Sequence, residues 1–403
     1  MRVRVFVVRL VLLVACLSCL TSAGEDEHTP QLLLSPKLLR RLKRDRERQT
    51  VRWLNFEKRV QTVPDSPERG FELALYYVVT RDGQRGREAV AWALAHKSEA
   101  RQAALVDDWA ADLISPEQQR ALEPPSTAGN TPPERAAALR DRLFSAITDR
   151  TLDHTPLDSY NKQLLEQLTK GGATDPDTLY AAVEYLMAVR SSRREDLRET
   201  EPQFFSRLPR EFLLSMRPAQ VEHPTWTAHI AALALVTLDP NLENSQFLQG
   251  WALEDRQMLR DGPGVAYEFL WADPYLPGIA YQNMDPWSYD PAGRLFARRS
   301  WEVDSCWIRV TKQGRDEENC GPSLATQPLQ IGTLTLIPLT SSCANIPNRT
   351  NRDAAIVWNL KPEAQLPYES GGQRNHGQAD AAGMWLVPAD TAGRVCVQGR
   401  AKR

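Results

Sequence analysis

Aromatic side chains gather in one stretch of this 403-residue chain, where they could hold a ligand that has flat, apolar faces. Ten of them fall within 41 consecutive residues, although aromatic residues make up only 8% of the chain. They are Tyr267, Phe269, Trp271, Tyr275, Tyr281, Trp287, Tyr289, Phe296, Trp301 and Trp307. Rings in this number either bury a core that two domains share or form the wall of a ligand site.

Two tyrosines of this stretch and one histidine are the candidates for proton transfer. Tyr267 and Tyr281 could act as general acid or base, and His229 could do the same. Each has a structural alternative: a buried, hydrogen-bonded phenol for the tyrosines, and a core or capping residue for His229 on its apolar segment. The chain has no phosphate-binding loop, nucleophile elbow or His-Glu-x-x-His zinc motif, so we predict no cofactor and no metal site.

Helix-start signals dominate the residues that precede the aromatic stretch. Between residues 35 and 176 a capping side chain comes directly before a proline six times. The pairs are Ser35-Pro36, Ser66-Pro67, Ser115-Pro116, Thr131-Pro132, Thr155-Pro156 and Asp175-Pro176. Two of these starts are capping boxes, Ser115 with Gln118 and Thr131 with Glu134. With apolar residues at helical spacing between them, they predict consecutive helical hairpins in an incomplete α/α toroid over residues 66–272.

Alternating apolar and polar residues replace the helical pattern after Pro274. The strand candidates are 294–298, 306–310, 329–337, 355–358, 384–387 and 395–397. They predict a small antiparallel β-sandwich over residues 273–403. The expected fold class is therefore mostly α followed by β.

Four cysteines are confined to this strand-rich part: Cys306, Cys320, Cys343 and Cys396. An even number of this kind predicts two disulfides formed in an oxidising compartment. Of the three possible connectivities we favour Cys306 with Cys320 and Cys343 with Cys396. A zinc site is disfavoured because no Cys-x-x-Cys pair occurs among them.

Residues 1–23 have the features of a signal peptide. A basic start and a short apolar segment precede the small residues Thr21-Ser22-Ala23, which predicts export to the periplasm or the extracellular space. The segment Leu13-Val14-Ala15-Cys16 also fits a lipoprotein cleavage box. In that alternative Cys16 carries a lipid that tethers the protein to a membrane, and this is the only membrane contact we predict.

The charge balance excludes one class of partner. Removal of residues 1–23 takes away three arginines and no acidic residue, so the formal net charge changes from −2 to −5. A nucleic-acid-binding protein would need a basic excess. One local exception lies in the N-terminal segment 24–65, where residues 37–59 hold ten basic and three acidic side chains. This basic helix is either a solvated face or a patch for an anionic polymer or membrane head groups.

Several segments resemble heparinase II/III-like proteins, over roughly residues 65–310. The most specific segments are EFLWADPYLPG (268–278) and GRLFARRSWE (293–302), and ALYYVVTRD (74–82) and LVDDW (105–109) add to them. The resemblance implies a toroid joined to a β-sandwich and the cleavage of uronate-containing polysaccharides by β-elimination. It also implies that aromatic residues border the sugar cleft. We expect Trp271, Tyr275, Trp287 and Tyr289 to bind the sugar, and His229, Tyr267 and Tyr281 to be catalytic.

The chain departs from that family in having no Asn-His pair in its helical half, where such lyases often hold the group that neutralises the uronate carboxylate. Two function classes remain open. One is an exported polysaccharide lyase that acts on anionic glycans. The other is a non-catalytic exported binding or scaffold protein with the same fold. A cleft that places His229 or His376 together with Tyr267 or Tyr281 within hydrogen-bond reach of one substrate would favour the lyase.

Overall fold

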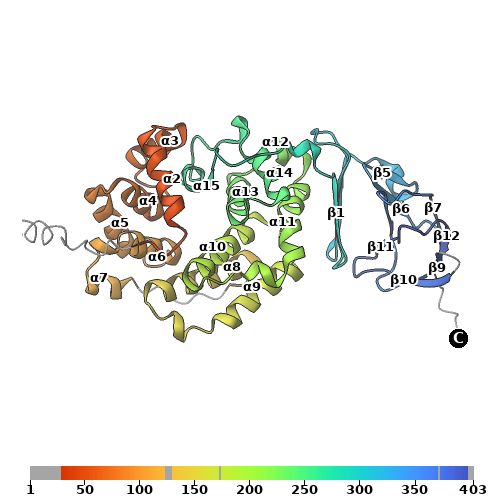
Figure 1. Ribbon diagram of the computed structural model, residues 1–403, viewed down its shortest axis with the longest axis horizontal. Helices are drawn as coiled ribbons and strands as arrows, with labels where there is room; N and C mark the ends of the chain where they lie inside the picture. Colours follow the sequence, from red (N-terminus) through yellow and green to blue (C-terminus); the bar gives the residue numbers. More distant parts are fainter. Residues whose placement is uncertain (1–28, 123–128, 172–173, 371–372, 398–403) are drawn as a thin grey trace, which may run out of the picture.

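The computed structural model describes residues 29–122, 129–171, 174–370 and 373–397. The expected signal peptide and Cys16 lie outside these residues. The chain forms helices first and strands second, so the predicted order of mostly α followed by β is confirmed (Figure 1). Within the described ranges, no helix combines the length and the apolar composition needed to cross a membrane.

Fourteen α-helices occupy the first two thirds of the described chain. They are α2 (Pro36–Glu47), α3 (Val51–Thr62), α4 (Arg69–Thr80), α5 (Gly83–Ala95), α6 (Ala100–Trp109), α7 (Pro116–Ala121), α8 (Pro132–Thr148), α9 (Leu157–Gly171), α10 (Pro176–Arg193), α11 (Pro202–Ser215), α12 (Pro218–Glu222), α13 (Trp226–Leu238), α14 (Glu243–Ala252) and α15 (Val265–Trp271).

Local capping explains where several of these helices begin. The side chains of Ser35, Ser115, Thr131 and Asp175 accept hydrogen bonds from backbone N–H groups of the first turns of α2, α7, α8 and α10. Both predicted capping boxes are present. The Ser66 hydroxyl instead bonds to the buried pair Arg59 and Glu72, and α4 begins three residues later at Arg69.

The helices pack as a ring. In order, α3, α4, α6, α8, α10, α13 and α15 each contact the next, and α15 contacts α3 again. At this closure Phe56 stacks on Phe269 with ring centroids 5.0 Å apart, and Arg52 pairs with Glu268 at 2.6 Å. The other long helices, α5, α9, α11 and α14, pack against members of the ring. The helices therefore form a ring that α15 closes onto α3, whereas the sequence predicted an incomplete toroid that begins only at residue 66.

Several helices of the ring run in the same direction. Side chains from the first two turns of α4, α10, α13 and α15 meet around Tyr267, which contacts Phe71, Tyr180 and Trp226. The C-terminal ends of α4 and α15 meet α2 at the other side of the ring, where Arg46 donates to the carbonyl of Val79 at 3.0 Å. Cationic side chains at these ends complement carbonyls that have no partner within their own helix.

Twelve strands follow the described helices. They are β1 (Trp287–Asp290), β2 (Arg294–Arg298), β3 (Trp307–Thr311), β4 (Gly314–Glu318), β5 (Leu329–Ile331), β6 (Leu334–Pro338), β7 (Cys343–Ile346), β8 (Ala354–Trp358), β9 (Gln365–Ser370), β10 (Gln373–Gln378), β11 (Trp385–Leu386) and β12 (Gly393–Cys396).

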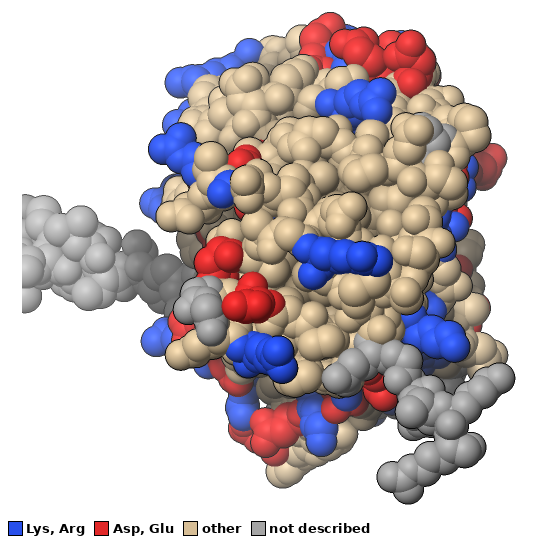
Figure 2. Space-filling model, turned by 90° about the vertical axis from the view of Figure 1, so that its right-hand side faces the viewer, with Lys and Arg blue, Asp and Glu red and all other residues tan. Residues whose placement is uncertain are grey.

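The strands form two four-stranded sheets and two two-stranded ribbons. The sheet orders are β1-β2-β3-β4 and β11-β8-β6-β5, and the ribbons are β10-β9 and β12-β7. Buried residues of both four-stranded sheets share one apolar cluster, which includes Leu295, Ile308, Leu334 and Ile356. One pair, β6 with β8, is parallel, which differs from the all-antiparallel sandwich that we expected. Figure 2 shows the strand-rich end of the molecule, where charged residues of both signs are scattered over a mostly uncharged surface.

Both predicted disulfides are confirmed with the favoured connectivity. Cys306 bonds Cys320, and Cys343 bonds Cys396. Cys343 and Cys396 lie directly opposite each other in the β7–β12 ribbon. The two bonds cross-link the part of the chain whose short strands bury the smaller apolar clusters.

A buried carboxyl group in α6 makes stability depend on pH. Burial raises the pKa of Asp107 to about 6, and the hydrogen bond from Gln119 only partly offsets this. The folded state therefore binds a proton at a pH where the unfolded chain has released it, so the stability contribution is lost as pH rises through this pKa. We expect Asp107→Asn to raise the free energy of unfolding by about 1–3 kcal/mol near neutral pH.

The same substitution should have little effect at about pH 4, where Asp107 is protonated in the folded protein. Urea denaturation followed by circular dichroism at the two pH values measures the difference. An equal effect of Asp107→Asn at both values would show that the carboxyl group of Asp107 is not the cause.

Candidate functional site

His229 lies in the closure of the ring and not in an open cleft. Its side chain is fully buried, and Nε2 donates to Oε2 of Glu268 at 2.7 Å. Glu268 also accepts from Arg52 at 2.6 Å. Burial raises the pKa of Glu268, but the hydrogen bond from His229 and the charge of Arg52 outweigh it, so this pKa lies below its ordinary value. An ionised Glu268 thus holds α3, α13 and α15 together through two charge-assisted contacts.

Tyr267 belongs to a second buried group. Its hydroxyl accepts a hydrogen bond from the hydroxyl of Tyr180 at 3.0 Å, and the guanidinium of Arg101 lies 5.3 Å from its ring centroid. Burial raises the pKa of Tyr267 well above its ordinary value, so the phenol stays protonated at neutral pH. Arg101 is already neutralised by Glu184 at 2.7 Å and Glu68 at 3.0 Å.

Tyr281 lies in a third place, in the short 3-10 helix Tyr281–Asn283 between the two parts of the protein. Its hydroxyl accepts from Arg256 at 3.3 Å, and its ring packs edge-on against Trp301. The structure therefore puts the three candidate proton-transfer residues into three separate groups. Each of the three side chains is buried, and no hydrogen bond joins one to another.

The four aromatic residues expected to bind sugar divide into two pairs. Trp287 donates to Thr333 at 3.0 Å and Tyr289 donates to Asp380 at 3.0 Å, so both connect the first sheet to later strands and turns. Trp271 and Tyr275 lie at the C-terminal end of α15, where they line one pocket. The second pair therefore shares a concave surface.

We call this concavity the α2 pocket. Its volume is about 580 Å³, which is in the usual range for ligand sites. It is lined by Leu33, Ser35, Lys37, Leu38, Arg41, Arg44, Met187, Arg190, Ser191, Thr237, Pro240, Trp271, Asp273, Tyr275 and Leu276. It lies between α2 and the C-terminal ends of α10, α13 and α15.

Hydrogen bonds fix the wall of the pocket that precedes α2. Asp108 accepts from the backbone N–H of Gln31 at 2.9 Å and of Leu32 at 2.7 Å. The indole of Trp109 donates to the carbonyl of Leu32 at 2.9 Å. Leu33 adopts φ 58°, a left-handed conformation that turns the chain towards α2. The segment before α2 is thus held against α6, and it gives the pocket a defined edge.

Two of the four cations in the pocket bind backbone carbonyls of the protein. Arg41 donates to the carbonyls of Leu270 and Ala272 and pairs with Asp273 at 3.4 Å. Arg190 donates to the carbonyl of Leu238 at 3.0 Å. These bonds satisfy carbonyl groups at the ends of α13 and α15. Within the basic run, Arg41 and Arg46 are therefore explained by carbonyls at helix ends that need cationic partners.

The other two cations remain available to a ligand. Lys37 and Arg44 are exposed, and neither forms an ion pair with a described residue. The guanidinium of Arg44 lies 5.9 Å from the ring centroid of Tyr275. The pocket thus holds four cations and a single carboxylate, that of Asp273, beside two aromatic rings.

Tyr275 connects the pocket to another carboxyl group. Its hydroxyl accepts from Arg48 at 3.2 Å and donates to Asp45 at 3.5 Å. Burial and the nearby Asp273 raise the pKa of Asp45, although Arg41 and Arg44 act against them, and the pKa remains above its ordinary value. Asp45, beside the pocket, therefore loses its negative charge at a higher pH than an exposed aspartate does.

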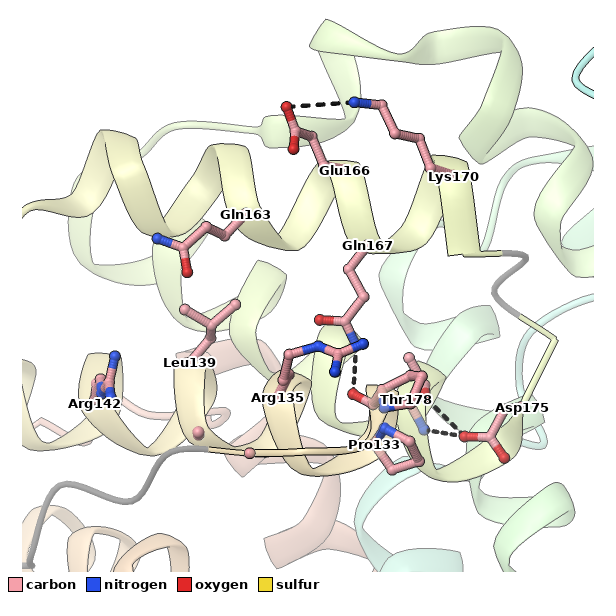
Figure 3. A pocket seen from close by; sticks show the side chains of 13 residues that line it. Pro133, Arg135, Leu139, Arg142, Gln163, Glu166, Gln167, Lys170, Asp175 and Thr178 are labelled. Atoms are coloured by element: carbon pink, nitrogen blue, oxygen red, sulfur yellow. Dashed lines mark hydrogen bonds and ion pairs between the residues drawn. The ribbon is translucent and has the colours of Figure 1, made fainter.

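A larger cavity of about 780 Å³ lies between α8, α9 and the start of α10 (Figure 3). Its polar side chains bond mainly to one another and to nearby backbone. Lys170 pairs with Glu166 at 3.5 Å, and Asp175 accepts from Thr178. The α2 pocket is the better candidate because it offers two cations without a described ion-pair partner, Lys37 and Arg44, together with aromatic rings.

Sequence reasoning identified part of the α2 pocket. The basic run and the aromatic stretch each indicated residues that line this pocket. Nothing in the sequence indicated Met187, Arg190 or Thr237, since they lie in the last turns of helices with ordinary apolar patterns. No protein-family model matches the chain, and a search of curated proteins gives no match.

Proposed function

We propose that this protein is an exported binding protein for acidic, uronate-containing polysaccharides and that it holds a short length of chain in the α2 pocket. We further propose that it is a non-cleaving relative of the heparinase II/III-like proteins that its sequence resembles. The observation that carries this proposal is that one pocket combines aromatic rings with two exposed cations, Lys37 and Arg44, that form no ion pair with a described residue. Cations bind carboxylate and sulfate groups, and ring faces bind the apolar faces of sugar rings.

The surroundings of the candidate catalytic residues favour binding over cleavage. A β-elimination needs an accessible base and a group that neutralises the uronate carboxylate. Tyr267 is buried and protonated, and the charge of Arg101 beside it is balanced by Glu184 and Glu68. His229 is held by Glu268 away from solvent.

Titration calorimetry with defined oligosaccharides tests the proposal. The full chain should bind a uronate tetrasaccharide saturably and should not bind a neutral tetrasaccharide of equal length. Affinity should fall as salt concentration rises, because the cations of the pocket are partly exposed. Equal binding of the acidic and neutral ligands would count against the proposal.

Binding of a sulfated oligosaccharide is expected to strengthen as pH falls below neutral. The raised pKa of Asp45 means that this group loses its negative charge before an ordinary aspartate does, so the pocket becomes more positive. Sulfate stays ionised in this range, so the ligand's sulfate charge is constant. Asp45→Asn should bind more tightly near neutral pH and should lose most of the pH dependence. An unchanged pH profile in that variant would show that Asp45 is not responsible.

A further inference from the structure

The exposed side of α2 and α3 combines cations with apolar side chains. Along α2 the exposed cations Lys37, Arg40, Arg44 and Arg48 recur at helical spacing, the last of them at the C-cap. On α3 the exposed residues Val51, Leu54 and Lys58 follow at the i, i+3 and i+7 positions, so they lie on one face. We call these two stripes, together with Tyr275, the basic face.

The two stripes are continuous. Tyr275 accepts a hydrogen bond from Arg48 at 3.2 Å, and its ring lies beside Arg44. Val51 comes three residues after Arg48, across the Thr50 cap of α3. The exposed cations of α2 are therefore followed directly along the chain by the exposed apolar residues Val51 and Leu54 of α3.

Exposure of large apolar side chains is unusual elsewhere in the described part of the chain. Six such residues are exposed, and three of them belong to the basic face. Their exposed fractions are 51% for Val51, 43% for Leu54 and 54% for Tyr275. Aliphatic side chains such as Val51 and Leu54 contribute little to the binding of a soluble, highly charged polymer. A lipid bilayer accommodates them at the boundary of head groups and acyl chains.

The charge of the basic face fits an anionic membrane. Five exposed cations accompany one exposed acid, Glu47. The acidic residue of α3, Glu57, is only partly exposed and accepts a hydrogen bond from the hydroxyl of Tyr76. Clusters of this kind attract anionic phospholipids, and inserted apolar side chains add to the attraction.

We infer that the basic face docks the protein onto a bilayer that contains anionic phospholipid. Val51 and Leu54 enter the head-group region, and Arg40, Arg48 and Lys58 contact lipid phosphates. This contact is independent of any lipid on Cys16. It goes beyond the proposed polysaccharide binding. Lys37, Arg44 and Tyr275 of the basic face also line the α2 pocket, whereas the five residues assigned here to lipid contact do not.

Sedimentation of the full chain with vesicles tests the inference. Vesicles of equal parts phosphatidylcholine and phosphatidylglycerol should bind the protein, and pure phosphatidylcholine vesicles should not. Arg40→Glu with Lys58→Glu should weaken binding by about 20-fold or more, since each cation contributes a factor of about five. Val51→Ser with Leu54→Ser should remove the binding that remains at high salt, where charge attraction is screened.

A matched control carries the same charge change on the C-terminal strands. Lys361→Glu with Arg374→Glu, both exposed, should bind vesicles as the unchanged protein does. Oligosaccharide titrations separate this contact from the α2 pocket, since the Val51 and Leu54 variant should retain sugar binding. Equal binding to both kinds of vesicle, or no effect of the Arg40 and Lys58 variant, would overturn the inference. Loss of sugar binding without loss of vesicle binding in that variant would overturn it too, by assigning the face to the polysaccharide.

Discussion

Exchange of Lys37 and Arg44 for glutamate is expected to abolish the binding of acidic oligosaccharides. Both side chains line the α2 pocket and are free of described ion-pair partners, so they can bind carboxylate or sulfate groups directly. A hydrogen bond to a charged group contributes about 1.5–3 kcal/mol, so the loss of two such bonds corresponds to about 100-fold or more in Kd. Repulsion between the new carboxylates and the ligand adds to this loss.

The control for this experiment is Lys361→Glu with Arg374→Glu, which changes the net charge by the same amount on the C-terminal strands. Calorimetry should give the control variant the affinity of the unchanged protein. Similar losses in both double variants would mean that net charge, and not the pocket, determines binding. Thermal unfolding of each variant checks that the exposed substitutions leave the fold intact.

Removal of the Glu184 carboxylate is expected to cause the largest loss of stability. Glu184 is fully buried and pairs with Arg101 at 2.7 Å and with Arg140 at 3.1 Å. Glu184→Ala leaves two buried guanidinium groups short of a partner, and losses from such changes are about 3–5 kcal/mol. Because Glu184 joins α6, α8 and α10, the whole ring should unfold at a lower urea concentration.

Glu166→Ala is the matched control, since it removes the same group from an exposed ion pair with Lys170 on α9. Exposed pairs of this kind contribute less than about 1 kcal/mol. Urea denaturation followed by circular dichroism at the helical minimum compares the two variants. Equal shifts of the two midpoints would contradict the role of Glu184 as the shared partner of Arg101 and Arg140.

Helix starts were predictable from sequence where the decisive hydrogen bonds are local. At Ser115 and Thr131 the capping groups lie within three residues, so the sequence contains the whole interaction. Ser66 looked equivalent, but its hydroxyl bonds to the buried pair of Arg59 and Glu72, a tertiary contact that no local pattern reveals.

The strands were less predictable because their stability depends on distant neighbours. The stretch Asp316–Glu318 has the composition of a solvated loop, yet it belongs to the edge strand β4, and Asp316 lies opposite Arg309 of β3. The expected single strand over residues 329–337 is a hairpin that turns at Gly332, where φ is +55°. Pairing of β6 with β8 in parallel could not be inferred from alternation alone.

The candidate site was predictable only as separate parts. The aromatic stretch and the basic run were each visible in sequence, but Arg44 and Tyr275 are far apart in the chain and meet only because α15 closes the ring beside α2. The residues expected to transfer protons were chosen by their amino-acid type, which does not show whether a side chain is buried. His229, Tyr267 and Tyr281 remain predictions as catalytic residues, each with a structural role in its own hydrogen-bonded group.

The central claim is that this protein binds acidic polysaccharides without cleaving them. The most direct test incubates the full chain with a uronate oligosaccharide of defined length and follows both binding and cleavage. Equilibrium dialysis should show saturable binding, and chromatography should recover the oligosaccharide at its original length. Ultraviolet absorbance should not rise, because no unsaturated product forms. An absorbance increase with shortened chains would establish a lyase instead, and the absence of binding to any acidic oligosaccharide would contradict a polysaccharide ligand for the α2 pocket.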